Sequence, residues 1–375
     1  MSIAPAIESA NRSPEDVHPR SSTGPGLIRH SHPALDEAEE YALRGVLASG
    51  HLAQGPQVAV FEEEVGRFLT LPPGVATSSG TAALHLALLS LGVGPGDEVL
   101  LPAYVCTAPL LAVSYAGAVP VLVDVDPTTG NMDPLDLKKR LTRRSKAIIV
   151  VHLFGMPAAV KEFLAPGLPV IEDCAQALGA WQQEGKVGTF GDLAMCSFSA
   201  TKLITTGEGG MLLGRDKSLL ERARDLREYD KKDTFAVRFN YKMTDIQAAM
   251  GRVQLGKLGR FLSKREALAE VYTARLAASS RCILPPHTQG RIYYRYVVSL
   301  PQSPAVLIPR LFDRGVETAR PVYRPLHRYL EQTGYPGADE AWSSHLSLPL
   351  HPSLVPEEVL EACRAFQETM EEIGL

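Results

Sequence analysis

The sequence predicts an α/β protein in which a mainly parallel, seven-stranded sheet lies between helices, followed by a smaller C-terminal α+β domain. Short apolar runs alternate with segments of helical periodicity from Val75 onward, and this alternation is typical of parallel sheets covered on both faces. Several of the runs end in a polar or small residue, as strands that border a binding site do. The 375 residues are also enough to form a large core and a second, smaller one.

Seven apolar runs are expected to be the strands: residues 75–77, 99–101, 121–123, 147–151, 170–171, 193–198 and 211–213. Ser78, Asp124, His152 and the pair Glu172-Asp173 follow four of these runs. Because ligands of such sheets bind beyond the carboxyl ends of the strands, a site is expected where these polar residues meet.

The remaining segments predict the domain organisation. Residues 1–26 are rich in Ser, Pro, Gly and charge, so they are expected to be a mobile tail. The apolar spacing from Thr244 to about Ala278 predicts one long helix. This helix leads from a large domain, residues 27–255, into a small one, residues 256–375. In the small domain we expect a strand at 292–300 and helices at 307–312 and 356–373.

Composition and charge exclude several classes of protein. A net charge of −4 and a pI near 6.2 give no basic field for nucleic acid. The five cysteines are scattered without metal-ligand spacing, which predicts reduced thiols and no metal site. The N-terminus lacks the apolar segment of a signal peptide, so a cytoplasmic protein is expected. Pro102, Pro109 and Pro120 interrupt the uncharged stretch 99–123, which argues against a membrane span.

Three segments carry residue types with binding or catalytic chemistry, and each also has a purely structural interpretation. Residues 78–81 join a strand to a helix, where backbone N–H groups either bind a phosphate or form an ordinary capped turn. The pair Glu172-Asp173 follows a buried strand, so a carboxylate there either pairs with a cation, such as a protonated ring nitrogen, or caps a helix. Lys202, among apolar neighbours, is either a nucleophilic amine or a surface lysine that extends to water.

In this order along the chain, the segments resemble the DegT/DnrJ/StrS family of sugar aminotransferases, which are fold type I enzymes dependent on pyridoxal 5'-phosphate. The resemblance extends from about Ile28 to Pro352. It implies that residues 27–255 are the cofactor-binding domain. The matching segments are 49–56, 79–81, 96–99, 124–126, 152–155, 172–176, 205–210, 240–249, 323–327 and 348–351.

The resemblance implies a role for individual residues. Lys202 carries pyridoxal 5'-phosphate as a Schiff base and is the catalytic base, and Asp173 faces the nitrogen of the pyridine ring. Gln176 faces the ring hydroxyl. The residues implied to hold the phosphate within the same chain are Gly80, Thr81 and Ser197.

Two further positions concern the partner subunit and the cofactor ring. The resemblance implies that Asn240 reaches the phosphate bound to a second subunit, which makes the protein a homodimer with shared active sites. At Cys106 the chain departs from the family, which usually has an aromatic residue there that stacks on the cofactor ring. Tyr104 could take its place only if the loop follows a different path.

The implied reaction moves an amino group from L-glutamate or L-glutamine to a keto sugar linked to a nucleotide, with a keto-cyclitol as the alternative acceptor. A sugar dehydratase or a non-catalytic regulatory relative on the same scaffold is a further alternative. A dehydratase usually lacks the Schiff-base lysine, and a non-catalytic relative would be expected to lose Lys202 or Asp173. This sequence has both Lys202 and Asp173. A group of basic residues could contact a diphosphate or form a solvated loop: Arg227, Lys231, Lys232, Arg238 and Lys242.

Overall fold

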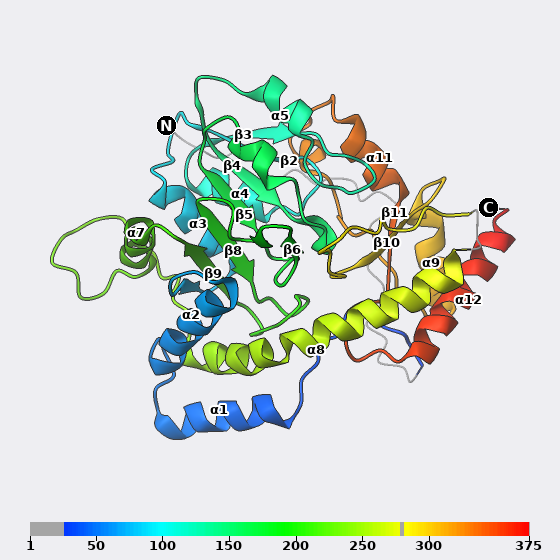
Figure 1. Ribbon diagram of the computed structural model, residues 1–375, viewed down its shortest axis with the longest axis horizontal. Helices are drawn as coiled ribbons and strands as arrows, with labels where there is room; N and C mark the ends of the chain where they lie inside the picture. Colours follow the sequence, from blue (N-terminus) through cyan, green and yellow to red (C-terminus); the bar gives the residue numbers. More distant parts are fainter. Residues whose placement is uncertain (1–25, 278–280, 375) are drawn as a thin grey trace, which may run out of the picture.

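A seven-stranded sheet forms the centre of the molecule (Figure 1). The computed structural model describes residues 26–277 and 281–374, so nearly all of the predicted tail over residues 1–26 lies outside the described residues. β9 is antiparallel to both of its neighbours, whereas the pairings from β8 to β3 are parallel, which confirms the predicted sheet. In spatial order the strands are β1 (Val75–Thr77), β9 (Gly210–Gly214), β8 (Leu193–Ser197), β5 (Val170–Asp173), β4 (Ser145–Val151), β2 (Glu98–Pro102) and β3 (Val119–Val123).

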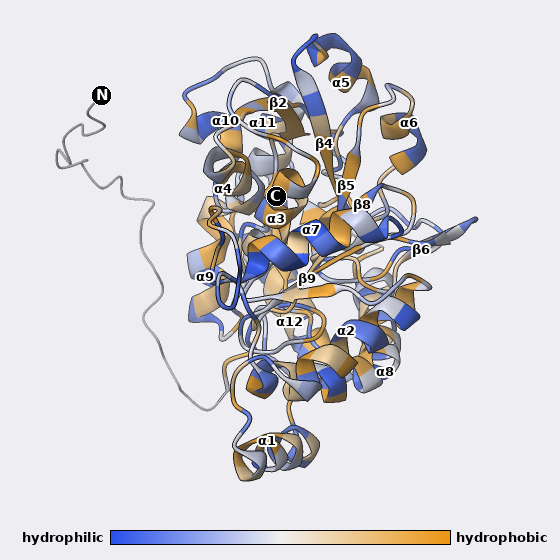
Figure 2. Cartoon of the chain, turned by 90° about the vertical axis from the view of Figure 1, so that its left-hand side faces the viewer, coloured by the Kyte–Doolittle hydropathy of each residue, from blue (hydrophilic) through white to orange (hydrophobic). Residues whose placement is uncertain are grey.

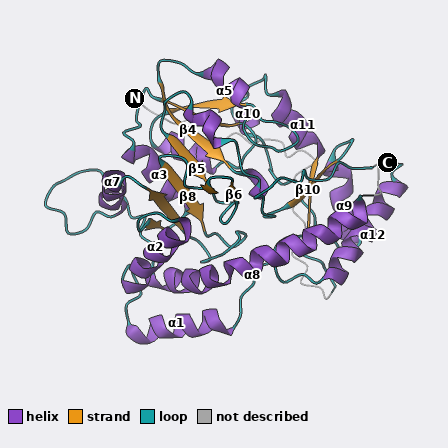
Figure 3. Ribbon diagram, in the orientation of Figure 1, coloured by secondary structure: helices purple, strands orange, loops and turns teal. Residues whose placement is uncertain are grey.

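Both faces of the sheet are covered by helices (Figure 3). Every residue of β1, β2, β5 and β9 is buried, as expected of strands enclosed on two sides. Side chains alternate between two cores: Leu212 belongs to one, and its neighbours Met211 and Leu213 belong to the other. The first core contains α3 (Gly80–Ser90), α4 (Ala108–Tyr115) and α7 (Lys217–Arg227), and the helices of the opposite face are α2 (Pro56–Leu69), α5 (Pro134–Arg140) and α6 (Val160–Leu164).

The helix α8 (Asp245–Leu276) connects the sheet to the C-terminal part of the chain (Figure 1). Its Leu258 and Phe261 pack in the core on one face of the sheet, whereas Leu268 and Tyr272 pack in a separate core. The proposed division after residue 255 therefore falls inside this helix. The elements of the C-terminal part are β10 (Tyr296–Ser299), α9 (Leu307–Asp313), α10 (Leu326–Tyr329), α11 (Pro336–Ser344), β11 (His345–Leu348) and α12 (Pro356–Glu372), with β10 and β11 antiparallel.

Two N-terminal helices, α1 (Glu37–Ser49) and α2, are present in addition to the elements predicted from the sequence. α1 lies along α8, and its buried Glu39 accepts hydrogen bonds from Gln254 and Lys257, both at 2.7 Å. At the start of α2, Asp245 of α8 accepts hydrogen bonds from the backbone N–H groups of Gly55 and Val58, both at 2.9 Å. The first contact pairs a buried carboxylate with donors of α8. The second satisfies backbone N–H groups at the start of α2 that have no partner within the helix.

The hydropathy of the elements follows their position. β4 and α3 are mainly hydrophobic, whereas α7 carries hydrophilic residues on its outer side (Figure 2). Within residues 26–277 and 281–374, no helix has both the length and the apolar character needed to cross a membrane. The uncharged stretch 99–123 folds as β2, α4 and β3, as its prolines predict.

Candidate active site

The carboxyl ends of β1, β5 and β8 lie at one edge of the sheet, and polar residues gather there. Asp173 at the end of β5 lies opposite Met195 of β8. Gly210 of β9 lies between Thr77 of β1 and Ser197 of β8. The segment after β1 and the end of β8 are therefore separated by a single strand, as the polar strand ends predict.

Asp173 is a buried carboxylate, only 5% exposed. Its Oδ1 accepts a hydrogen bond from the backbone N–H of Ala175 at 3.0 Å. Burial raises the pKa of the carboxyl group, and the Ala175 N–H, Lys202 and His152 oppose this shift. No helix begins directly after β5, so Asp173 is not a helix N-cap. A buried carboxylate of this kind is stabilised by a nearby cation.

Lys202 lies in the turn after β8 and is half-buried. Its backbone N–H donates to the carbonyl oxygen of Ser199 at 2.9 Å. Its Nζ lies 5.5 Å from the centre of the Tyr294 ring. The ammonium group acts electrostatically on both Asp173 and Cys106, where it opposes the rise in pKa that burial causes. The structure thus brings Lys202 and Asp173, which are on different strand ends, to one place.

The N-terminus of α3 meets the end of β8. The Oγ of Ser79, the N-cap, accepts a hydrogen bond from Ala82 at 3.1 Å, which leaves the N–H groups of Gly80 and Thr81 at the open end of the helix. A Cβ atom at Gly80 would lie 2.9 Å from the Cβ and 3.1 Å from the Oγ of Ser197. The missing side chain therefore lets backbone donors and a hydroxyl group converge, as a phosphate requires.

Gln176 follows Asp173 along the same edge. Its Oε1 accepts a hydrogen bond from the backbone N–H of Phe154 at 2.8 Å. Because this contact assigns the oxygen, the side-chain NH2 group is the part of the amide that is left to donate to a ligand. A donor is the group that a phenolic oxygen of a cofactor requires.

These residues fit pyridoxal 5'-phosphate. The convergence at Gly80 suits the phosphate, the buried carboxylate of Asp173 suits a protonated ring nitrogen, and the amine of Lys202 suits an aldehyde. The three groups come from three different strand ends of one sheet.

Cys106 lies where the family usually has a stacking aromatic residue. It is exposed to solvent, although surrounding protein raises the pKa of its thiol, and Lys202 and Asp173 are among its electrostatic neighbours. Tyr104 does not replace the aromatic residue, because it is fully buried. Its hydroxyl oxygen lies 3.2 Å from Nδ1 of His345 in the core. The loop therefore leaves Cys106, and not Tyr104, beside the site.

Asn240 is exposed and follows the loop that projects beyond α7 (Figure 1). The next residue, Tyr241, accepts a hydrogen bond from the backbone N–H of Ser78 at 2.7 Å. This contact fixes the segment to the edge of the sheet that carries Gly80. Phe235 in the same loop is fully exposed, and Val237 is 73% exposed.

His152, Glu172 and Cys174 form a buried cluster whose possible metal-ligand atoms lie within 4.8 Å of one another. Nδ1 of His152 accepts from the Ala158 N–H at 2.9 Å, so Nε2 carries the proton and donates to Glu172 at 3.1 Å. The carboxylate of Glu172 also accepts three backbone N–H groups, from Gly188, Phe190 and Gly191. The cluster is thus a hydrogen-bonded network that holds the end of β5.

One residue near the site, Tyr294, was missed by sequence reasoning. Tyr294, which packs against Lys202, was expected only as part of a strand, because its contact depends on how α8 and β10 approach the sheet. Of the proposed diphosphate-binding residues, four pair with acids of this chain: Arg227 with Glu62, Lys232 and Arg238 with Asp225, and Lys242 with Asp230. These pairs favour the structural interpretation of that group.

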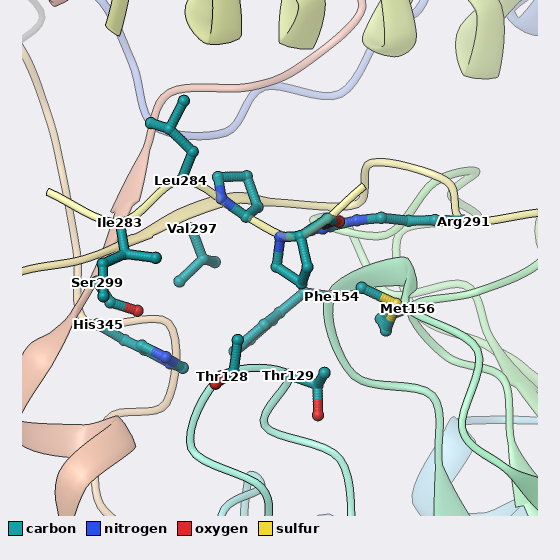
Figure 4. A pocket seen from close by; sticks show the side chains of 12 residues that line it. Thr128, Thr129, Phe154, Met156, Ile283, Leu284, Arg291, Val297, Ser299 and His345 are labelled. Carbon is teal, nitrogen blue, oxygen red and sulfur yellow. Dashed lines mark hydrogen bonds between the residues drawn. The ribbon is translucent and has the colours of Figure 1, made fainter. Parts of the chain in front are cut away.

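A small pocket lies between the segment 283–286 and the turn at Thr128 and Thr129 (Figure 4). Phe154, Arg291 and His345 also line it. Its volume of about 20 Å³ holds a water molecule but not a sugar. Neither Lys202 nor Asp173 lines this pocket.

Comparison with known proteins finds relatives that are similar over most of the chain. The chain is 35% identical over 360 residues to the GDP-perosamine synthase of Caulobacter vibrioides, with 90% of this chain and 97% of that protein covered. It is 34% identical to the dTDP-4-dehydro-2,3,6-trideoxy-D-glucose 4-aminotransferase of Saccharopolyspora spinosa, with 92% and 97% covered. The crystal structure of the aminotransferase TlmJ from Streptoalloteichus hindustanus is similar with a TM-score of 0.89 and 35% identity, covering 93% of this chain and all of that one.

The family match extends over residues 33–367, which include every site residue described above. The chain belongs to the DegT/DnrJ/EryC1/StrS aminotransferase family.

Proposed function

We propose that this protein transfers an amino group from L-glutamate or L-glutamine to a keto sugar linked to a nucleotide, with pyridoxal 5'-phosphate as its cofactor. The observation that carries the proposal is the approach of Lys202 to the buried Asp173 beside the open N-terminus of α3. The names of the two relatives, which specify GDP-linked and dTDP-linked sugars, support a nucleotide-linked acceptor. The presence of Lys202 argues against a dehydratase, which usually lacks this lysine. The presence of both Lys202 and Asp173 argues against a non-catalytic relative.

The residues divide the chemistry among them. Pyridoxal 5'-phosphate, when bound, supplies a conjugated ring that accepts the electron pair released when a C–H bond next to the amine breaks. Asp173 would hold a proton on the ring nitrogen, and its burial would strengthen this charge pairing. Lys202 would hold the aldehyde carbon, and its amine, when free, would move a proton. Gln176 would donate to the ring oxygen. Gly80, Thr81 and Ser197 would orient the phosphate.

The proposal includes a homodimer in the cytoplasm. The exposed Phe235 and Val237 lie in the loop that leads to Asn240, and apolar residues exposed together are typical of an interface. Asn240 would contact the phosphate bound to the partner subunit. Free cysteines are consistent with a reducing compartment.

Substitution of Lys202 tests the proposal directly. The purified protein is expected to show the visible absorption band of a Schiff base, and L-glutamate or L-glutamine should convert it to the pyridoxamine spectrum. Lys202→Ala should lose the band and still bind pyridoxamine phosphate, because the phosphate contacts remain. A control substitution at another lysine, Lys186→Ala, should keep the band, because Lys186 contacts Phe68 instead. If the band persists in Lys202→Ala, the cofactor is attached elsewhere. A panel of nucleotide-linked keto sugars and keto-cyclitols then identifies the acceptor.

A further inference from the structure

Two arginines meet beside Tyr294, on the side of that residue where the segment 29–32 and α8 approach β10. Arg265 of α8 is 2% exposed and donates to the carbonyl oxygens of Tyr294 at 3.1 Å and Leu350 at 2.9 Å. The guanidinium carbon of the half-buried Arg295 lies 4.9 Å from the centre of the Tyr294 ring. Two positive charges are therefore held close together at this position.

Within the described residues, neither arginine has a carboxylate within 4.0 Å. Arg295 instead donates to Nδ1 of His30 at 3.2 Å, and Nε2 of His30 in turn donates to Ser347 at 2.8 Å. These contacts make His30 neutral, so it offers no compensating charge. The carboxylate of Glu317 accepts the backbone N–H of His30 and does not pair with either arginine. Partly buried cations without a counter-ion are costly, so the cluster favours an anionic ligand.

The ionisation of neighbouring groups reflects the same positive field. Burial would raise the pKa of Tyr294, yet Arg295 and Lys202 lower it to about 8. Burial, and then Arg265, lower the pKa of His351 to about 4. The positive charge that favours the ionised form of Tyr294 would also stabilise an anionic ligand bound beside Arg295.

The cluster also lies within reach of the reacting amine. Nζ of Lys202 is 5.5 Å from the ring centre of Tyr294, and Arg295 contacts the same ring at 4.9 Å. The distance between Nζ of Lys202 and the guanidinium carbon of Arg295 therefore cannot exceed the sum of these two distances. L-glutamate covers such a span, because its amine must react where Lys202 is attached and it carries a carboxylate at each end of a five-carbon chain.

We propose that Arg295, supported by Tyr294 and Arg265, forms an anion subsite that binds a carboxylate of the amino donor. The inference rests on the proposed function, since it assumes that an amino acid reacts at Lys202. Arg295 provides the charged donor groups, Tyr294 holds the guanidinium group in place, and Arg265 adds positive charge from behind. The diphosphate of the acceptor is the competing anion.

The experiment compares Arg295→Gln with Arg291→Gln in the cofactor-loaded enzyme. Arg291 is a matched control because it is also half-buried, contacts Tyr293 at 4.7 Å, and lines the pocket of Figure 4. Single-turnover kinetics give the apparent Kd for L-glutamate, and calorimetry gives the Kd for glutarate, which has no amine. Arg295→Gln should weaken both by about 10- to 100-fold, the effect of losing a charge-assisted hydrogen bond. Arg291→Gln should change neither.

Further measurements separate the possible outcomes. Arg295→Lys keeps the charge and should lose less affinity than Arg295→Gln; it also replaces that variant if Arg295→Gln does not fold. Unchanged affinity for both donor probes in a folded Arg295→Gln enzyme overturns the subsite. The proposal is also overturned if only the binding of GDP or dTDP weakens, because the anion is then the diphosphate. If the wild-type enzyme converts no amino donor, the proposed function fails, whereas glutarate binding still tests the subsite.

Discussion

Asp173 combines two opposing effects, since burial disfavours its charge while Lys202 and a backbone N–H favour it. Asp173→Asn keeps the shape of the side chain and removes the charge that holds the proton on the ring nitrogen. We expect a folded protein whose kcat falls by several orders of magnitude, because each pKa unit is worth about 1.4 kcal/mol. Asp216→Asn is the control: Asp216 is the N-cap of α7, where asparagine serves equally well. Wild-type turnover in Asp173→Asn would contradict the assigned role.

Cys106 offers a second test at the residue scale. Tyr104 is held in the core. Of the two residues, only the exposed Cys106 can therefore be replaced by a larger side chain that lies beside Lys202. Cys106→Tyr should tighten cofactor binding by about 0.5 to 1.5 kcal/mol, the usual contribution of an aromatic pair. Equilibrium dialysis of pyridoxal 5'-phosphate measures this change, with Cys282→Tyr as a control away from the site. Weaker binding would indicate that another group already covers the ring.

At the scale of elements, Glu172 joins β5 to the segment 188–191 through its hydrogen bonds to backbone N–H groups. Glu172→Gln replaces an acceptor by an amide whose NH2 group faces these donors. We expect the free energy of unfolding at pH 7 to fall by about 2 to 4 kcal/mol. Urea denaturation measures it, and the exposed Glu162→Gln should stay within about 0.5 kcal/mol of wild type.

The same network predicts a pH dependence. Burial raises the pKa of Glu172, but the hydrogen bond from His152 and the N–H groups outweigh it, so the pKa in the folded protein lies below its ordinary value. Glu172 therefore stabilises the fold above its unfolded pKa, and this contribution is lost as the pH falls through the folded pKa. The stability difference between wild type and Glu172→Gln should narrow on acidification. A constant difference across that range would show that Glu172 acts through packing alone.

At the scale of the whole molecule, the proposed shared site predicts complementation between two inactive variants. If Asn240→Ala loses phosphate binding and Lys202→Ala loses the reactive amine, each pure dimer has two damaged sites. In a mixed dimer one site combines the intact Lys202 of one chain with the intact Asn240 of the other. Random pairing should restore about a quarter of wild-type activity. If verified mixed dimers stay inactive, Asn240 serves the site of its own chain.

The structure also indicates which parts of the fold were predictable. All seven strands of the sheet follow apolar runs, because strands covered by helices need largely hydrophobic sequence. The edge strand β3 is fully buried only at its carboxyl end. The helices α1 and α2 were not among the expected elements, although both carry local signals, a capping box at Asp36 with Glu39 and a proline at the start of α2. The strand expected at 292–300 is shorter, at Tyr296–Ser299, because its length is set by pairing with β11.

The sequence by itself determined the sheet and the long helix α8, since each depends on a local pattern, and it singled out Lys202 and Asp173 through the order of several segments along the chain. Only the tertiary structure decided that Tyr104 lies in the core, that most of the basic group near Asn240 is paired with acids, and that Arg265 and Arg295 meet beside Tyr294. The physical reason is that these contacts join segments distant in sequence. Their geometry depends on how α8 and β10 pack against the sheet, and no local pattern specifies that.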